Sequence, residues 1–142
     1  MTENQFIMFR VGREKYGVNI NEINTISAYI DITKSPNSHQ AIEGMINLRG
    51  SIIPVINLHK YFNVDPMAIG NDTRIIICNL SETTIGFLTD EASKVIKVNN
   101  QNIEKTPSLI TTSETEYITG ICKYNDELIT LLSFEHMISN II

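Results

Sequence analysis

The side chain best suited to grip a partner is Arg49, which stands beside Gly50 at a bend between two apolar runs. The runs cover residues 44–48 and 51–58, and their aliphatic side chains favour strands on both sides of the bend. Gly50 permits backbone angles that other residues resist. A guanidinium keeps its proton and is a poor base, but its planar fork recognises carboxylates, carbonyls and aromatic faces. The bend predicts either a recognition site or an arginine paired with a surface acid.

No catalytic or metal-binding pattern is visible in the sequence. Cys78 and Cys122 lie in separate apolar, strand-like segments without a Cys-x-x-Cys pair, so we expect buried free thiols. His39, His59 and His136 lack the spacing of metal ligands. A cysteine and a histidine can still meet in space, but no local segment resembles a known nucleophile turn. We therefore expect no enzyme activity, no catalytic residue, no metal and no cofactor.

The charge balance argues against nucleic acid as a partner. The 142 residues carry 16 acidic and 11 basic side chains, giving a net charge of −5, and there is no tryptophan. Such a chain is repelled by polyphosphate, and its basic residues do not interleave with aromatic ones as a stacking groove requires. The N-terminus does not resemble a signal peptide, and no apolar stretch approaches the ~20 residues of a membrane-spanning helix. The expectation is a cytosolic protein that does not insert into a membrane.

The elements that must position Arg49 are short strands and turns. Asn19 and Glu22 have the spacing of a weak capping box, and isoleucines recur at helical spacing from residue 20 to 26, which predicts a short helix there. Pro54 cannot donate to a strand ladder, so its strand is expected to be an outer or interrupted one. The strands expected in this half are residues 6–11, 16–20, 41–46 and 52–58, followed by a helical turn at 59–62 and a polar loop at 63–72.

The second half follows the same alternation. Asn125-Asp126 suits the positive backbone angles of a tight hairpin turn, and Ser133 is the expected N-cap of a closing helix with one apolar face. The strands expected here are residues 73–80, 84–89, 95–98, 117–123 and 127–132, and residues 99–116 are polar without a period.

Many short strands with few brief helices predict an all-β protein. A count of about ten strands exceeds what one small barrel holds, so two small packed barrels are expected within a single domain of residues 1–142. Composition does not locate the boundary between them, and no internal repeat of fixed period is visible.

Several segments match a known family in order and spacing. The strongest is Asn-Leu-Arg-Gly within residues 42–58, and the others are residues 9–18, Pro36-Asn37, residues 73–77, Gly86 with Asp90, and residues 117–121. Together they resemble the CheW family of chemotaxis coupling proteins over nearly the whole chain. The resemblance implies two packed five-stranded small β-barrels with short helices, including a C-terminal helix. It also implies a non-catalytic adaptor between the regulatory domain of the histidine kinase CheA and the cytoplasmic tips of chemoreceptors, recruited to membrane-associated receptor arrays.

The resemblance also implies which residues bind. Those matched to receptor binding are Arg49, Asn47, Leu48, Gly50 and Ile23. Thr73 and Ile75 match positions near kinase or receptor contacts and are candidates for either. An arginine fork beside an apolar groove could hold the end of a receptor helical hairpin, whereas the isoleucines could equally be ordinary core residues.

Five positions depart from the family pattern. Thr25 stands where a glutamate is frequent, Asn57 replaces an aspartate, His59 an arginine, His39 a proline and Ser133 an aspartate. Thr25 puts one receptor contact in question, whereas Asn57 and Ser133 can still cap or accept hydrogen bonds. An alternative function is therefore that of a CheW-like paralogue serving a separate, non-flagellar sensory array.

Two further alternatives remain open. The chain could be the regulatory module of a larger CheA-like kinase or of a coupling–receiver fusion, but the short segment before residue 6 favours a free-standing protein. A barrel enzyme acting on carbohydrates or nucleotides would need clustered acids. Asp126 and Glu127 are more simply solvated turn residues, and Asp90-Glu91 a polar strand end.

Overall fold

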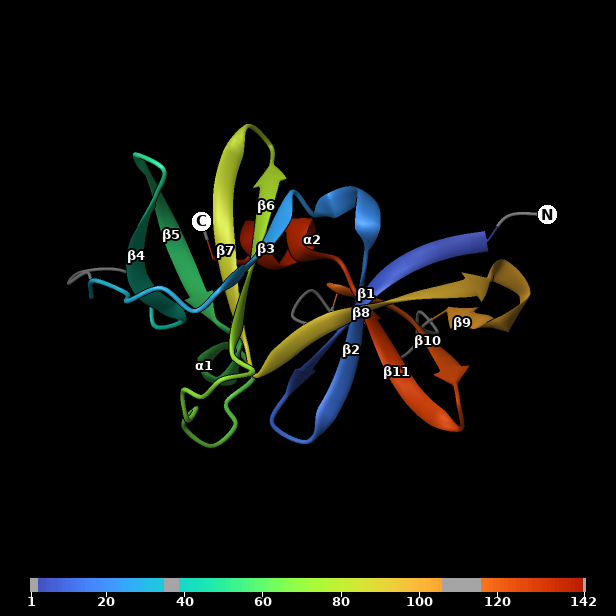
Figure 1. Cartoon of the computed structure of the whole chain (residues 1–142). Helices are drawn as coiled ribbons and strands as arrows, with labels where there is room; N and C mark the ends of the chain where they lie inside the picture. Colours follow the sequence, from blue (N-terminus) through green and yellow to red (C-terminus); the bar gives the residue numbers. More distant parts are fainter. Residues whose placement is uncertain (1–2, 35–38, 106–115, 142) are drawn as a thin grey trace.

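The protein is built from two β-sheets that lie side by side, as the computed structural model of residues 3–34, 39–105 and 116–141 shows (Figure 1). The all-β prediction is confirmed, and short helices join the strands. The matched pair Pro36-Asn37 and part of the polar segment 99–116 lie outside the described residues.

The first sheet has six strands in the order β8-β1-β2-β11-β10-β9, one more than the five expected. The additional strand is β9, which lies in the polar segment that showed no period and pairs with β10 over three residues. The strands are β1 (Glu3–Val11), β2 (Glu14–Asn19), β8 (Glu91–Asn99), β9 (Ile103–Lys105), β10 (Ile118–Tyr124) and β11 (Glu127–Leu132).

The second sheet has the expected five strands, in the order β3-β6-β7-β5-β4. Its two edges approach each other, because Thr33, beyond β3, forms an antiparallel bridge with Met45 of β4. The sheet is therefore curled like a barrel. The strands are β3 (Thr25–Ala28), β4 (Ile42–Leu48), β5 (Ser51–Asn57), β6 (Arg74–Leu80) and β7 (Thr83–Thr89).

The two sheets share one topology. In each, two hairpins lie next to each other with their second strands parallel, β2 beside β11 and β7 beside β5. A short helix follows at the equivalent place, α1 (Leu58–Tyr61) after β5 and α2 (Phe134–Ser139) after β11. Glycine occupies matching positions of the parallel ladders, with Gly17 opposite Leu131 and Gly86 opposite Val55. A Cβ atom at Gly86 would lie 2.8 Å from the Ile75 side chain, so this position has no room for one.

The prediction of a short helix after β2 is wrong. Only a 3-10 turn, η1 (Ile20–Glu22), is present, and the chain then enters β3. The Asn19 side chain does cap this turn by accepting from the Asn21 amide at 2.8 Å. The Asn24 amide donates to Ile77 at 2.8 Å and Ile26 pairs with Ile76, so pairing with β6 outweighs the helical spacing of the isoleucines.

Pro54 was expected on an outer or interrupted strand, and the outer placement is wrong, because β5 lies between β4 and β7. The parallel ladder with β7 begins only at Val55, however, and Pro54 is opposite Met45 of β4. At Pro54 the strand therefore has β4 as its only partner in the sheet, and a proline is tolerated there because no second ladder needs its missing N–H.

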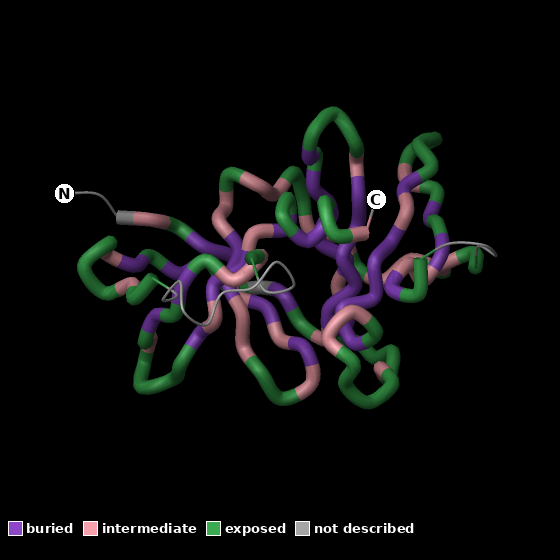
Figure 2. Tube along the Cα trace, turned by 180° about the vertical axis from the view of Figure 1, so that it is seen from behind, coloured by how far each residue is buried: buried purple, intermediate pink, exposed green. Residues whose placement is uncertain are grey.

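Three hydrophobic clusters hold the fold together. One lies within each sheet, and the largest is shared between the sheets and α2. In the shared cluster the rings of Phe87 and Phe134 stack at 3.8 Å, and Phe9 lies against Phe134 at 5.6 Å. Figure 2 shows buried backbone concentrated where the sheets meet and exposed hairpin tips. Cys78 and Cys122 are buried free thiols, as expected.

Candidate functional site

The Arg49 turn is a tight two-residue hairpin loop. Leu48 and Ser51 are the last paired residues of β4 and β5, and between them Arg49 and Gly50 both have positive φ, 54° and 87°. Such a pair matches the twist of the flanking strands. The Oδ1 of Asn47 accepts a hydrogen bond from the Gly50 amide at 3.0 Å, which fixes the loop. Asn47 and Gly50 therefore shape the turn, and the Arg49 side chain is exposed.

The conformation of Arg49 carries a cost. A left-handed backbone at a residue with a Cβ atom is unfavourable by about 1–2 kcal/mol. Turns of this kind favour Asn, Asp and Gly at their central positions, and the β10–β11 turn has Asn and Asp there, with φ of 50° at Asn125 and 65° at Asp126. The prediction of a tight turn at Asn125-Asp126 is thereby confirmed. Ser81 and Glu82 of the β6–β7 turn also have positive φ, 49° and 67°, so this conformation recurs in the tight hairpin turns of the fold.

A shallow pocket of about 410 Å³ lies between the Arg49 turn and β3. The curling of the second sheet brings the two walls together although their strands are at opposite ends of the strand order. Leu48 and Arg49 form one wall. The other wall is formed by residues 24–27, which include the exposed Thr25, so a partner at this pocket would meet an arginine and a hydroxyl.

Ile23 lies two residues before Thr25 and is half-buried. Its side chain packs against the hydrophobic cluster shared by the two sheets, and its amide donates to Ile20 at 3.2 Å at the end of η1. The structure therefore places Ile23 beside the pocket in the chain but not in its wall. Its exposed part could extend a contact surface that begins at Thr25.

Thr73 and Ile75 are not surface residues. Thr73 is 2% exposed and its hydroxyl accepts from the Gly70 amide at 2.9 Å. Ile75 is fully buried in the core of the second sheet. Their side chains cannot contact a partner in this arrangement, and for Ile75 the core alternative describes its place.

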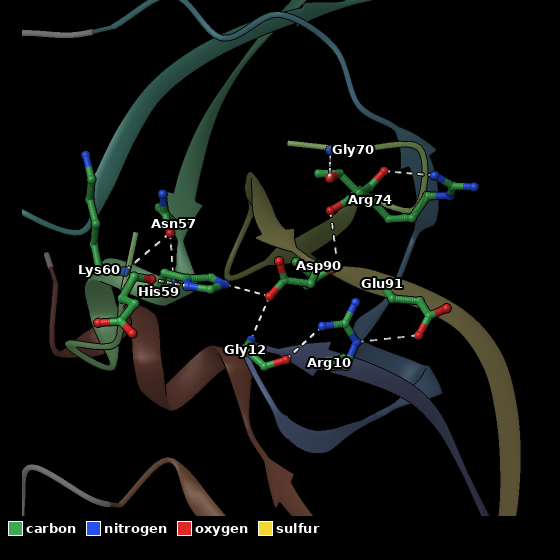
Figure 3. A network of polar contacts seen from close by, with 12 residues as sticks. Arg10, Gly12, Asn57, His59, Lys60, Gly70, Arg74, Asp90 and Glu91 are labelled. Atoms are coloured by element: carbon green, nitrogen blue, oxygen red, sulfur yellow. Dashed lines mark hydrogen bonds and ion pairs between the residues drawn. The ribbon is translucent and has the colours of Figure 1, made fainter. Parts of the chain in front are cut away.

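Two of the departures from the family pattern belong to a polar network at the junction of the sheets (Figure 3). Asn57 caps α1, its Oδ1 accepting from the amides of His59 at 2.9 Å and Lys60 at 3.3 Å. The nearly buried His59 ring places Nε2 2.5 Å from Oδ2 of Asp90 and Nδ1 2.6 Å from the Asp65 carbonyl. This network is structural, because both ring nitrogens already have oxygen partners.

Asp90 extends the network into the first sheet. Its Oδ2 accepts from the Gly12 amide at 2.6 Å, and its own amide donates to the Arg10 carbonyl at 3.0 Å. Gly12 belongs to the β1–β2 turn, whereas His59 belongs to α1 beside the second sheet (Figure 3). One carboxylate thus joins both halves of the molecule. Its neighbour Glu91 faces Arg10 at 3.7 Å in a far more exposed pair.

Two pairs of exposed aliphatic side chains lie at equivalent places on the outer hairpins, a feature that our sequence analysis missed. On β4–β5 they are Met45 and Ile52, exposed by 37% and 61%, and on β10–β11 they are Ile121 and Leu128, exposed by 40% and 70%. Figure 1 shows these hairpins at opposite ends of the molecule. Exposed apolar side chains that lie together are candidates for protein contacts. The sequence signal that could have revealed the pair on β4–β5 was the uninterrupted apolar run before Asn57.

Comparison with known proteins agrees with this architecture. Residues 5–141 match the family model described as CheW-like domain. The chain belongs to the CheW family. It is 32% identical over 135 residues to the chemotaxis protein CheW of Helicobacter pylori, covering 94% of this chain and 81% of the relative. With the Bacillus subtilis chemotaxis protein CheW it shares 31% identity over 131 residues, covering 92% and 84%.

A solved CheW-family structure has the same fold. The crystal structure of the scaffolding protein TtCheW from Thermoanaerobacter tengcongensis superimposes with a TM-score of 0.82 at 34% identity, covering 93% of this chain and 85% of that one. Among the described helices none is both long and apolar enough to cross a membrane. Within residues 3–34, 39–105 and 116–141, no three His, Cys, Asp or Glu side chains gather as metal ligands would. The family and the β-rich fold of this chain therefore agree.

Proposed function

We propose that this CheW-family protein is a non-catalytic adaptor that couples methyl-accepting chemoreceptors to a CheA-type histidine kinase. The observation that carries the proposal is the exposed Arg49 side chain, held in a hydrogen-bonded turn beside a pocket walled by β3. A fork of N–H donors at a fixed position can grip carboxylates or carbonyls at the end of a helical hairpin. Such partners would draw the protein to the cytoplasmic side of membrane-associated receptor arrays.

The receptor surface in this proposal comprises Arg49, the adjoining Leu48, and the η1–β3 segment with Ile23 and Thr25. Asn47 and Gly50 act through the shape of the turn rather than by contact. Half-buried aliphatic groups around an arginine give the combination of apolar anchor and charged donor that carries binding energy in protein interfaces. Thr73 and Ile75, being buried, are left out of the contact surface.

The kinase would use a different surface. The exposed pair Ile121/Leu128 lies on β10–β11, at the opposite end of the molecule from the β4–β5 hairpin, so a kinase domain bound there leaves the Arg49 side chain accessible. The other exposed pair, Met45/Ile52, adjoins the Arg49 turn. Contacts at both ends would allow kinase domains and adaptors to alternate in a ring. Signalling contacts of this type are modest in area and reversible.

The test is a pair of calorimetric titrations, one with the isolated regulatory domain of a CheA-type kinase from the same cell and one with a receptor signalling fragment. We expect saturable one-to-one binding of the kinase domain, unchanged by Arg49→Glu, and weakened receptor binding by that variant. Arg13→Glu is the matched control, since Arg13 is an exposed arginine in the β1–β2 turn of the other sheet. Equal receptor binding by wild type and Arg49→Glu would remove Arg49 from the site.

A second candidate is a CheW-like paralogue for a separate, non-flagellar array, and one observation favours it. Among the departures from the family pattern, Asn57 and His59 are satisfied inside the fold, whereas Thr25 lies in the wall of the Arg49 pocket. A threonine in place of a glutamate at that wall changes the side chain that a receptor would contact. Titration against receptors of the swimming and non-swimming systems separates the two candidates: preference for the latter supports the paralogue.

A further inference from the structure

Glu22 occupies a junction between the candidate receptor surface and the C-terminal helix. It is the last residue of η1, the turn that carries the chain from β2 of the first sheet to β3 of the second. Ile23 follows it directly, and Thr25 begins β3. Movement of the Glu22 backbone would therefore act first on Ile23, because the Asn24 amide and the strand ladder hold β3 to β6.

The Glu22 side chain reaches α2 rather than its own turn. Its Oε1 accepts a hydrogen bond from the Glu135 amide at 3.1 Å, across 113 positions of sequence, and the Phe134 amide also interacts with this carboxylate. These amides belong to the first turn of α2, where backbone N–H groups have no partner within the helix. Glu22 thus accepts hydrogen bonds from backbone amides that have no acceptor within α2.

The other cap of α2 is independent of η1. The Oγ of Ser133 accepts from the His136 amide at 3.3 Å, and this serine lies on the strand side of the helix, outside the receptor surface. The helix is anchored in the core, because Phe134 and Met137 are fully buried in the cluster shared by the sheets. Glu22 and Ser133 therefore stabilise the same helix from two different segments.

The environment of Glu22 does not favour a charge for stability alone. Burial raises the pKa of this carboxyl, which the backbone amides of Glu135 and Phe134 and the nearby His136 only partly offset, and the Glu135 side chain adds repulsion. A half-buried carboxylate thus occupies a place where a neutral residue would avoid the desolvation cost. This arrangement is better explained by a positional role than by a gain in stability.

We propose that Glu22 is a positioning residue for receptor binding: by fastening η1 to α2 it holds Ile23, which lies just before the β3 wall of the Arg49 pocket. The inference rests on the proposed receptor surface and adds a residue that need not touch the receptor. Without the fastening, η1 keeps its Asn19 cap and its Asn24 anchor to β6, so the chain still folds while the intervening segment loses its support.

The test compares Glu22→Ala with Ser133→Ala, because each removes a cap from α2 and only the first releases η1. Binding to a receptor signalling fragment and to the kinase regulatory domain is measured by calorimetry, together with amide hydrogen exchange of residues 20–25. We expect Glu22→Ala to weaken receptor binding about tenfold, with faster exchange in residues 20–25 and unchanged kinase binding. Ser133→Ala should leave receptor binding and that exchange unchanged, and Glu22→Gln, which keeps one acceptor oxygen, should restore most of the affinity.

Two outcomes would overturn the inference. One is unchanged receptor binding by Glu22→Ala; the other is an equal loss in both alanine variants, which would assign the effect to the stability of α2. If wild type itself does not bind the receptor fragment, or Arg49→Glu binds as well as wild type, the proposed receptor surface fails instead. The hydrogen-exchange comparison still decides whether Glu22 fastens η1.

Discussion

His59 and Asp90 connect the two sheets through a single short contact, 2.5 Å between Nε2 and Oδ2, with side chains only 7% and 13% exposed. Asp90 also accepts from the Gly12 amide of the first sheet at 2.6 Å. A buried carboxylate with partners on both sides of a junction fixes their relative position, because each partner would otherwise lack an acceptor.

Removing the Asp90 carboxylate should therefore destabilise the whole protein. We expect Asp90→Ala to lower the free energy of unfolding by about 3 kcal/mol, since it leaves a nearly buried His59 ring nitrogen and the Gly12 amide without an acceptor. Urea unfolding followed by circular dichroism measures the loss. Glu91→Ala is the control, because its pair with Arg10 is long and exposed and should contribute less than about 0.5 kcal/mol. Similar losses for the two variants would show that the junction does not depend on Asp90.

Gly44 should not tolerate a side chain. A Cβ atom there would lie 2.1 Å from the Thr33 carbonyl oxygen, at the bridge that brings the edges of the second sheet together. We expect Gly44→Ala to cost about 3 kcal/mol, the upper range for overpacking, because the clash is with backbone. Gly70→Ala, with nothing within 4 Å of the added atom, should change stability by less than about 0.5 kcal/mol. Thermal unfolding of the two variants compares them, and a tolerated Gly44→Ala would mean that the bridge is not formed.

Phe134 should matter to both sheets at once. Its ring stacks on Phe87 of the second sheet and lies against Phe9 of the first. We expect Phe134→Ala to cost about 3–5 kcal/mol and to leave one cooperative transition, since the cluster that it weakens is shared. Near- and far-ultraviolet circular dichroism should report the same midpoint. Two separate transitions would show that the sheets unfold independently. Leu128→Ala, at a 70% exposed position, serves as the control.

Glu22 and Glu43 should contribute to the pH dependence of stability with opposite signs. Burial raises the pKa of Glu22, so the folded protein binds its proton more tightly than the unfolded chain does. Its contribution to stability is then largest in acid and declines as pH rises above the unfolded value of about 4.3. Burial also acts to raise the pKa of Glu43, but hydrogen bonds from Lys60 and Asn57, with the charges of Lys60 and Lys34, lower it overall. Its contribution is present above that unfolded value and is lost as pH falls.

Glutamine variants test these signs by urea unfolding at pH 3 and pH 7. The free energy of unfolding of Glu22→Gln, taken as its difference from wild type, should be more favourable at pH 7 than at pH 3. The reason is that the substitution removes a desolvated charge that wild type carries at pH 7. Glu43→Gln should be less stable at pH 7, by less than about 1 kcal/mol since Lys60 is partly exposed, and should approach wild type at pH 3. Parallel pH profiles for the two variants would contradict the assignment.

The sequence by itself determined the features that depend on a few neighbouring residues. Asn125-Asp126 adopts positive φ because short polar side chains tolerate that conformation, and Ser133 caps α2 because its hydroxyl reaches the His136 amide. The apolar runs on both sides of Arg49 become strands for the same local reason. The order and spacing of such segments were also enough for the family resemblance that the comparisons bear out.

Only the tertiary structure decided what depends on residues far apart in the chain. Pairing with β6 made β3 a strand despite helical spacing, and Glu22 capped α2 instead of its own turn. The same long-range packing buried Ile75 and brought β3 beside Arg49. Spacing along the chain records local preferences of a few tenths of a kcal/mol per residue, whereas a strand ladder or a shared core adds many contacts whose sum outweighs them.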